Sequence, residues 1–343
     1  MKLEALRIKD IAKELNLSPS TVSKALRGSY EISAPTQKLV SDYAAKHGYK
    51  PNLVAQGLRK GRSKSIGVVV CNIDNNFFSQ VINGIESVAH KKDYNVIITQ
   101  THESFEREIL SVQHLFASSI DGLIISLSAE TSDISHISQL HQKGLPVVFF
   151  DRISNDIKTH KVICNNFSGA YEATRHLIQQ GFKRIAHIAS ATSLSITEER
   201  LSGYRKALED HNMPVDEQYI KYCAHSGMIK EEAEKAVEEL FALPHKPDAI
   251  FTASDRLSIT TYSILHKMNI AIPEDIGVVG FTNSSATDIF GPPLSSVVQP
   301  AFEMGIAATE MILQLIESKI PVTKFEKRVL EPQLIIRESA MKE

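Results

Sequence analysis

The sequence contains little that would support catalysis, secretion or membrane insertion. It has only three cysteines, Cys71, Cys164 and Cys223, and their spacing matches no metal-binding or redox motif, so we expect reduced, buried thiols. No apolar run reaches the roughly 18 residues that a membrane-spanning helix needs. The first residues, MKLEALRIKD, lack the apolar segment of a secretion signal. We therefore expect a soluble, cytoplasmic protein with no membrane partner.

Catalytic signatures are missing as well. The chain has no G-x-S-x-G, no P-loop, no G-x-G-x-x-G after a strand and no H-E-x-x-H. Its 13 histidines are scattered, and His176, His187 and His266 fall in amphipathic segments where a structural role is expected. The sequence thus predicts that the protein is not an enzyme and needs no metal or cofactor.

The charge of the chain is unevenly distributed. The net charge is only -2, yet residues 1–64 contain 13 Lys and Arg against five Asp and Glu, whereas the remainder contains 25 against 35. A basic amino-terminal part on an acidic remainder favours a polyanionic partner at one end only. The length of 343 residues predicts two or three compact units.

Three short helices are predicted in the amino-terminal part. Apolar residues recur at helical spacing over 8–15, and Ser18 is well placed to cap a second helix over 19–26 that begins with Pro19. Ser33 starts a third helix in the same fashion, and Gly48 stops it. The inner face of the third helix is expected to comprise Leu39, Val40, Tyr43 and Ala44. Short helices joined by a tight turn are typical of a helix-turn-helix.

The second helix carries small polar residues and one base on its outer face: Ser20, Thr21, Ser23 and Lys24. Small side chains allow the backbone to approach phosphates, and Lys24 is long enough to reach acceptors on a guanine edge. A helical domain that binds protein is the alternative. Charge, helix caps and turn spacing together favour DNA.

Residues 51–64 form a basic tether with a weak helical signal. Two turns with Gly57 inside are too short to be stable alone, so we expect this segment to fold only against a partner. Leu58 is apolar within it and has no obvious core to join. It is either a wedge inserted in the DNA minor groove or a linker residue that packs on the body, and spacing alone leaves both open.

From Ser65 the chain alternates between strands and helices. Continuous Val and Ile runs indicate parallel strands that are covered on both faces. The predicted fold class is a small all-α helix-turn-helix head plus an α/β body of two doubly wound parallel-sheet subdomains. The predicted strands are 66–72, 94–99, 121–126, 145–150, 161–165, 184–189, 249–253, 276–281 and 295–299.

Polar side chains gather at the carboxyl ends of these strands, where ligands of such sheets bind. Each alone is more often a helix cap than a ligand contact, but their convergence suits a hydroxyl-bearing solute. They are Asp74, Asn75, Asn76, Ser126, Asp151, Arg152, Asn165, Asn166, Ser190, Ser254, Asp255, Thr282 and Asn283, with Phe77, Phe78 and Phe150 as aromatic neighbours.

Together these features resemble the LacI/GalR family of bacterial transcription regulators over nearly the whole chain. The motifs that carry the resemblance are IKDIAKELNLSPSTVSKAL, PNLVAQGL, SKSIGVVV with NNFF, FDR, ERLSGYRKAL, AIFTASD and IPEDIGVVGF. The resemblance implies a homodimer that binds double-stranded, near-palindromic operator DNA and is controlled by a small-molecule effector. The implied domains are a head (1–50), a hinge (51–64) and a body (65–343), with an N-subdomain of about 65–163 and 293–324 and a C-subdomain of about 164–292 and 325–343.

The resemblance also assigns roles to individual residues. It places DNA contacts at Ser18, Ser20, Thr21, Ser23, Lys24, Ser33 and Thr36, and hinge contacts in the minor groove at Asn52, Ala55, Gln56 and Leu58. It therefore favours the wedge for Leu58. It places the effector cleft around Phe78, Asp151, Arg200 and Asp255, with Thr282 and Asn283 at the end of a late strand. Arg200 suits a bidentate grip on vicinal hydroxyls or a carboxylate.

Three departures from the family pattern stand out. Thr282 follows Gly280-Phe281 where relatives often carry Asp, so a carboxylate that would clamp sugar hydroxyls is missing. Relatives often have an aromatic residue near the position of Ser226. The chain ends at Glu343 without a heptad tail, which favours a dimer over a tetramer. The effector is expected to be a sugar or sugar derivative; a nucleobase or another metabolite is the alternative, as is a solute-binding protein of periplasmic type.

Overall fold

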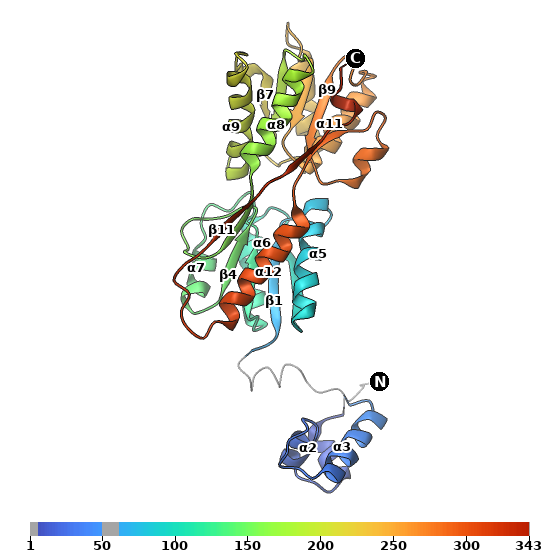
Figure 1. The fold of residues 1–343 in the computed structure, drawn as a ribbon, viewed down its shortest axis with the longest axis vertical. Helices are drawn as coiled ribbons and strands as arrows, with labels where there is room; N and C mark the ends of the chain where they lie inside the picture. Colours follow the sequence, from blue (N-terminus) through green and yellow to red (C-terminus); the bar gives the residue numbers. More distant parts are fainter. Residues whose placement is uncertain (1–5, 50–61, 343) are drawn as a thin grey trace. The chain divides into compact units, whose positions relative to one another are not determined.

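The computed structural model describes residues 6–49 and 62–342. The chain divides into two compact units, Met1–Ser63 and Lys64–Glu343. The first is the head and the second is the body, and each is considered by itself (Figure 1). The hinge residues Asn52, Ala55, Gln56 and Leu58 lie outside the described residues.

The head is a bundle of α1 (Ile8–Glu14), α2 (Pro19–Ala25) and α3 (Ala34–Lys46). Ile11, Val22 and Val40 are fully buried between the helices. Ser18 caps α2 as predicted, because its side chain accepts a hydrogen bond from the backbone N–H of Thr21. Leu39 was expected on the inner face of the third helix, and this was wrong. Its side chain is 52% exposed, because three helices leave room inside for only part of the α3 surface.

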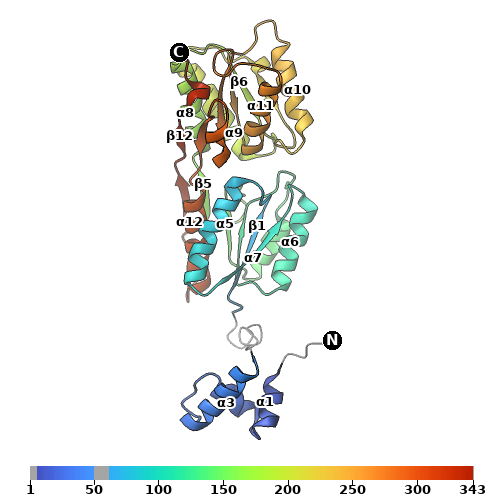
Figure 2. The same ribbon diagram turned by 90° about the vertical axis from the view of Figure 1, so that its right-hand side faces the viewer.

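The first lobe of the body, here called the N-lobe, contains a six-stranded parallel sheet with the strand order β11-β5-β4-β3-β1-β2. Helices α5 and α12 cover one face of the sheet, and α6 and α7 cover the other (Figure 2). Its elements are β1 (Ser65–Val70), α5 (Asn76–Lys91), β2 (Asn95–Gln100), α6 (Phe105–Ala117), β3 (Gly122–Ile125), α7 (Ser135–Gln142), β4 (Val147–Phe150), β5 (Lys161–Cys164), α12 (Ala301–Glu317) and β11 (Lys327–Leu330).

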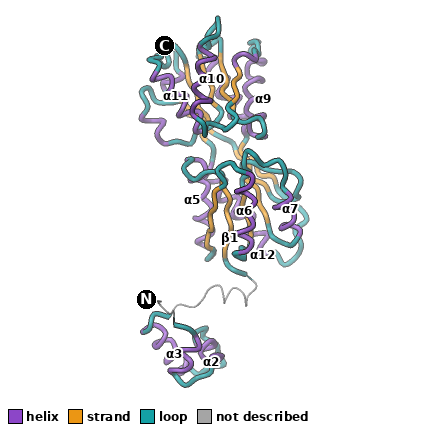
Figure 3. The backbone as a smooth tube through the Cα atoms, turned by 180° about the vertical axis from the view of Figure 1, so that it is seen from behind, coloured by secondary structure: helices purple, strands orange, loops and turns teal. Residues whose placement is uncertain are grey.

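The second lobe, the C-lobe, has a six-stranded sheet with the order β12-β10-β9-β8-β6-β7. Helices α8 and α9 pack together, as do α10 and α11, and Figure 3 shows the sheets between their helices from behind. Its elements are α8 (Asn166–Gln179), β6 (Ile185–Ala189), α9 (Ser195–Asp210), β7 (Ile220–Tyr222), α10 (Lys230–Phe241), β8 (Ala249–Thr252), α11 (Asp255–Lys267), β9 (Gly277–Phe281), β10 (Ser295–Val298) and β12 (Gln333–Ile335), with 3₁₀ turns at Glu217–Tyr219, Ser285–Ile289 and Glu338–Ala340.

The chain passes between the lobes three times: after β5, between β10 and α12, and between β11 and β12. The second and third crossings correct the expected subdomain boundaries at 292/293 and 324/325. Strand β10 pairs with β9 and therefore belongs to the C-lobe, whereas β11 pairs with β5 and belongs to the N-lobe. The sheet to which such a four-residue strand belongs is decided by the strands with which it forms hydrogen bonds. Its own sequence does not reveal these partners.

The nine predicted strands are all present, but β7, β11 and β12 were missed. Each is only three or four residues long and carries charged or polar residues at an edge of its sheet. Strand β12 runs antiparallel to β10, so the C-lobe sheet is parallel except at this edge, and the predicted fold class is confirmed. Within 6–49 and 62–342, none of the helices combines the length and apolar character required to cross a bilayer.

Candidate functional site

A cavity of about 60 Å³ lies between the two lobes, at the carboxyl ends of their strands. All six effector residues expected from the sequence line it. The lining residues from the N-lobe are Asn72, Asn75, Phe77, Phe78, Glu103, Asp151 and Arg152. Those from the C-lobe and its crossings are Ser190, Ile196, Arg200, Ser226, Met228, Ser254, Asp255, Arg256, Phe281, Thr282, Asn283 and Gln299.

Aromatic rings form the apolar part of the cavity. The ring of Phe78 meets the rings of Phe77 and Phe150 edge to face, with centroids 5.2 and 6.1 Å apart. Phe150 packs behind the cavity lining, whereas Phe281 contributes a third lining ring from the end of β9. Such rings provide a flat apolar surface against which a sugar ring or a planar base can pack.

Arg200 is held rigidly on α9, with only 4% of its surface exposed. Its Nε and Nη2 donate to Asn166 Oδ1 at 2.9 and 2.7 Å, and its Nη1 donates to the Ala253 carbonyl. The guanidinium lies over the ring of Phe281, with Cζ 3.7 Å from the centroid. Burial lowers the pKa of Arg200 to about 10, against the opposing influence of Asp151. Protein acceptors therefore occupy both edges of the guanidinium that a bidentate ligand would use.

Asp151 is the cavity carboxylate with the fewest protein partners. It follows β4 with φ of 58°, a left-handed conformation that is unusual for a residue other than glycine, and it is 5% exposed. Among the described residues its carboxylate has no hydrogen-bond donor, and Arg152 Nε lies 3.9 Å from its Oδ2. Burial raises the pKa of Asp151. A buried acceptor of this kind favours a ligand that brings its own donor, such as a hydroxyl or an N–H.

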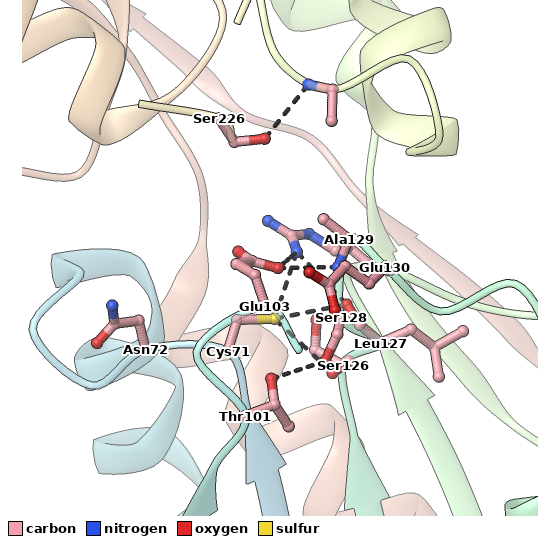
Figure 4. A network of polar contacts seen from close by, with 12 residues as sticks. Cys71, Asn72, Thr101, Glu103, Ser126, Leu127, Ser128, Ala129, Glu130 and Ser226 are labelled. Atoms are coloured by element: carbon pink, nitrogen blue, oxygen red, sulfur yellow. Dashed lines mark hydrogen bonds and ion pairs between the residues drawn. The ribbon is translucent and has the colours of Figure 1, made fainter. Parts of the chain in front are cut away.

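Arg152, the residue after Asp151, belongs to a network inside the N-lobe whose members Glu103, Cys71 and Ala129 are labelled in Figure 4. Its Nη1 donates to Glu103 Oε2 at 2.5 Å and lies 3.3 Å from Cys71 Sγ, and Glu103 also accepts from the Ala129 N–H at 2.9 Å. Although burial raises the pKa of Glu103, Arg152 lowers it below its ordinary value. Burial raises the pKa of Cys71, which disfavours its thiolate form. The network thus holds the loop at Ala129 against Glu103, which lines the cavity.

The Asp255 carboxylate accepts hydrogen bonds from both lobes. The residue begins α11, and its buried carboxylate accepts a hydrogen bond from the Thr282 hydroxyl. The backbone N–H groups of Asn283 and of Asn76 in the N-lobe also donate to it. Burial raises its pKa, and these donors oppose that rise. The Thr282 hydroxyl thereby satisfies part of the hydrogen-bonding capacity of the Asp255 carboxylate.

Direct polar contacts join the two lobes around the cavity. Arg256 Nη2 lies 2.5 Å from Asp74 Oδ1, and Ser193 Oγ donates to the Ala129 carbonyl at 2.9 Å. Asn283 and Gln80 exchange two hydrogen bonds across the lobes. The lobes are therefore in contact on several sides of the cavity.

Several polar residues at the strand ends act as helix caps. Asn75 and Asn165 accept backbone hydrogen bonds at the starts of α5 and α8. Of the residues highlighted at strand ends, Asp74, Asn76, Ser126, Asn165 and Asn166 do not line the cavity. Sequence reasoning missed Glu103 and Gln299, although both follow strands and the rule for strand ends could have found them.

In the head, the predicted DNA-contacting residues of α2 and its flanks lie at or near the surface. Ser18 and Thr21 exchange a hydroxyl hydrogen bond of 2.8 Å, and Ser33 and Thr36 one of 2.9 Å. Ser33 makes no cap bond to the backbone, unlike Ser18. Lys24 forms an ion pair with Glu31, so the lysine must leave this carboxylate to reach a guanine edge.

Family models match both units of the chain. The model described as bacterial regulatory proteins, lacI family, matches residues 7–52, and that described as periplasmic binding proteins and sugar binding domain of LacI family matches residues 63–335. The HTH-type transcriptional repressor PurR of Vibrio atlanticus is 30% identical over 332 residues, 96% of this chain and 97% of the relative.

Solved structures agree with these matches. A complex of the transcriptional regulator CelR with cellobiose shares 26% identity, covers 97% of this chain and 99% of its own, and superposes with a TM-score of 0.72. The Lac repressor dimer bound to operator and the anti-inducer ONPF has a TM-score of 0.83 at 22% identity, with 98% and 100% of the two chains covered. The second likeness establishes the fold.

Proposed function

Since the chain belongs to the LacI family of bacterial regulatory proteins, whose members are regulators and not enzymes, we propose that it is a repressor that binds a near-palindromic operator as a homodimer and responds to a small-molecule effector. The observation that carries this proposal is the cavity at the carboxyl ends of two sheets, lined by buried polar groups from both lobes. A ligand there would contact both lobes at once.

The head supports DNA as the partner. Its exposed hydroxyls gather on α2 and at the start of α3, and its residues and the tether carry the excess positive charge of the chain. In our proposal Ser18, Ser20, Thr21, Ser23, Ser33 and Thr36 contact phosphates, Lys24 contacts bases, and the hinge residues Asn52, Ala55, Gln56 and Leu58 enter the minor groove.

The body supports a dimer. Strand β2 is an edge strand of the N-lobe sheet and β7 is an edge strand of the C-lobe sheet. Ile97 and Ile98 on β2 are 36% and 37% exposed, and Tyr222 on β7 is 45% exposed. Helix α6 adds the exposed Leu110. Exposed apolar residues along unpaired edges favour burial against a second copy of the chain.

The effector would be a sugar or sugar derivative. Asp151 offers an unpaired acceptor, Ser190 a hydroxyl, and the buried Gln299 Nε2 has no hydrogen-bond partner among the described residues. Paired donors and acceptors beside an aromatic wall suit a neutral polyol ring. The match to the complex of CelR with cellobiose supports this class. A nucleobase is the second candidate, because the wall of phenylalanines would also stack a planar ring.

The mechanism follows from the contacts between the lobes. An effector that binds one closure state better than the other shifts the equilibrium between them. Because the chain enters the N-lobe at Lys64, a change in that lobe reaches the tether, and in the dimer it would align or spread the two hinge segments. Phe78, Asp151, Arg200, Asp255, Thr282 and Asn283 would sense the effector.

Two experiments test the proposal. Gel retardation with genomic fragments against bulk competitor DNA should show selective binding that weakens steeply with added salt, because phosphate contacts release counterions. A thermal-shift screen of sugars, sugar phosphates, uronic acids and nucleobases should then identify a stabilising effector. No preference for any fragment, with every candidate metabolite present, would leave a solute-binding protein as the better description.

A further inference from the structure

A second pocket, larger than the cavity between the lobes, lies in the N-lobe. Its free volume is about 230 Å³, and it is formed where β5 and β11 begin, at the opposite ends of these strands from the effector cavity. Three lysines contribute to its walls, and it is here called the lysine pocket. Its lining residues are Asn155, Ile157, Lys158, Thr159, Lys161, Phe325, Glu326 and Lys327.

Two of these lysines stand in an unfavourable arrangement. Lys161 and Lys327 are register partners on the adjacent parallel strands β5 and β11, and both line the pocket. Like charges at paired positions of neighbouring strands destabilise a sheet. Lys161 is half-buried, and burial together with Lys327 lowers its pKa. The fold therefore gathers three lysines around a pocket to which Glu326 contributes the one carboxylate among the lining residues.

The acidic groups nearby are already engaged. The Glu326 carboxylate accepts hydrogen bonds of 2.8 and 3.2 Å from Arg328. Asp156, which acts on Lys161 from a distance, accepts one of 3.0 Å from Ser154 Oγ. Lys161 Nζ makes a long contact of 3.5 Å with the Ile157 carbonyl. The lysines thus retain donors for an anion.

Phe325 gives the pocket an apolar side. Its ring meets the buried His160 ring edge to face at 5.6 Å, which holds it in place, while 36% of the residue stays exposed. His160 Nδ1 in turn accepts from the Glu326 N–H at 2.9 Å, so this hydrogen bond fixes the ring. A flat apolar surface beside three ammonium groups suits an anion that carries an organic part.

We propose that the lysine pocket binds a small phosphorylated metabolite, with the phosphate held by Lys158, Lys161 and Lys327 and the organic part against Phe325. The site is separate from the effector cavity, but one segment joins them. Residues 151–160 connect β4 to β5. They begin with Asp151 in the effector cavity and lead to Lys161 in the lysine pocket, and no helix lies between the two strands. An anion in the pocket would brace this segment at its far end.

The test uses the full chain with two probes, pyrophosphate and glycerol phosphate, compared with potassium chloride of equal ionic strength. Each probe should raise the midpoint of thermal unfolding in a saturable manner. The double variant Lys161→Gln/Lys327→Gln should bind the probes roughly tenfold more weakly or worse in titration calorimetry. Without anion, Lys327→Gln alone should raise the unfolding midpoint, since it relieves the repulsion.

Two controls separate the pocket from other basic surfaces. Lys91→Gln/Lys92→Gln removes a lysine pair at the end of α5, and Lys24→Gln removes a base of the head; both variants should respond to the probes like the unaltered protein. A probe response that survives in the pocket double variant, or that chloride reproduces, would overturn the proposal. So would a double variant that binds both probes normally but operator DNA more weakly, since the lysines would then serve DNA.

Discussion

Asn283 of the C-lobe and Gln80 of the N-lobe are joined by two hydrogen bonds: Asn283 Nδ2 donates to Gln80 Oε1 at 2.9 Å, and Gln80 Nε2 donates to the Asn283 carbonyl at 3.3 Å. Asn283 Nδ2 also donates to the Gln299 carbonyl, and Asn283 Oδ1 accepts from the Gln299 N–H. Asn283 is thus fully engaged within the protein. Its hydrogen bonds to Gln80 depend on the relative position of the two lobes, in addition to its place in the cavity lining.

Gln80→Ala should weaken the closed arrangement of the lobes. It removes both hydrogen bonds without disturbing the pairing of Asn283 with Gln299, a loss of about 1–2 kcal/mol, or roughly tenfold in the closure equilibrium. Fluorescence transfer between labels on the two lobes measures the shift. Ser87→Ala, a change on the same helix that removes a bond to the Gly84 carbonyl, serves as the control. Identical transfer in both variants would show that this pair does not hold the lobes.

Arg200→Ala should abolish the effector response and also lower stability. Removal of the guanidinium leaves Asn166 Oδ1 and the Ala253 carbonyl without their donor in a buried site, a loss of about 3 kcal/mol. DNA affinity without effector should stay close to that of the unaltered protein. Chemical denaturation, effector titration and gel retardation measure the three properties. A collapse of DNA affinity at full folding would instead make Arg200 part of the signal to the head.

His187 should make stability depend on pH. Its ring is stacked between those of Tyr204 and Phe251, and burial lowers its pKa from 6.5 to about 4. On acidification the unfolded chain takes up the proton first, so this stabilisation is present above pH 6.5 and is lost as the pH falls towards 4. The loss should reach about 3 kcal/mol.

His187→Phe tests that slope, because the ring stays and the titrating group goes. The free energy of unfolding of the variant should fall less between pH 6.5 and pH 4 than that of the unaltered protein. His90→Gln, the loss of an exposed histidine, should retain the full slope. Parallel curves for all three proteins would exclude His187 as the source.

Gly84→Ala should disrupt the packing of α5 on α12. A Cβ atom at Gly84 would lie 2.1 Å from the Phe302 carbonyl oxygen, and one at Gly305 equally close to that of Val81. Because backbone atoms cannot move aside as side chains do, the loss should be about 3 kcal/mol or more in denaturant unfolding. Gly291→Ala, with open space around it, should have little effect. A near-neutral Gly84→Ala would mean that the helices can separate without penalty.

Lys24→Ala should relax base preference within each half-site, whereas Thr21→Ala should weaken binding to all sequences alike. The reason is that we propose base contacts for Lys24, while the hydroxyl of Thr21 lies beside that of Ser18 at the start of α2, where we propose phosphate contacts. Competition gel retardation against half-site libraries distinguishes the two. If Thr21→Ala changed the preferred sequence, the assigned roles would have to be exchanged.

Leu58→Ala should reduce specific operator binding far more than non-specific binding. A wedge contributes only where the duplex is kinked at its proper step. Fluorescence anisotropy with operator and with random duplex of equal length measures the ratio. An equal loss on both duplexes would favour a linker leucine that packs on the body.

Much of the fold and of the site could be read from the sequence, because local signals encode them. Continuous Val and Ile runs marked the long strands, Ser18 marked the start of α2, and the charge excess marked the head. The rule that polar residues gather at strand ends predicts Asp151, Asp255 and Thr282 from the sequence alone. These features depend on neighbours in sequence, so one chain suffices to show them.

Only the tertiary structure decided which of these residues are engaged with the protein itself. The sequence predicted that Arg200 binds the ligand, yet its guanidinium already donates hydrogen bonds to Asn166 and Ala253. The Asp255 carboxylate likewise already accepts hydrogen bonds from Thr282 and from the N-lobe. The tertiary structure also decided to which sheet β10 and β11 each belong. Sequence periodicity reports whether a side chain is buried, but hydrogen-bond partners distant in the chain decide what that side chain can still bind.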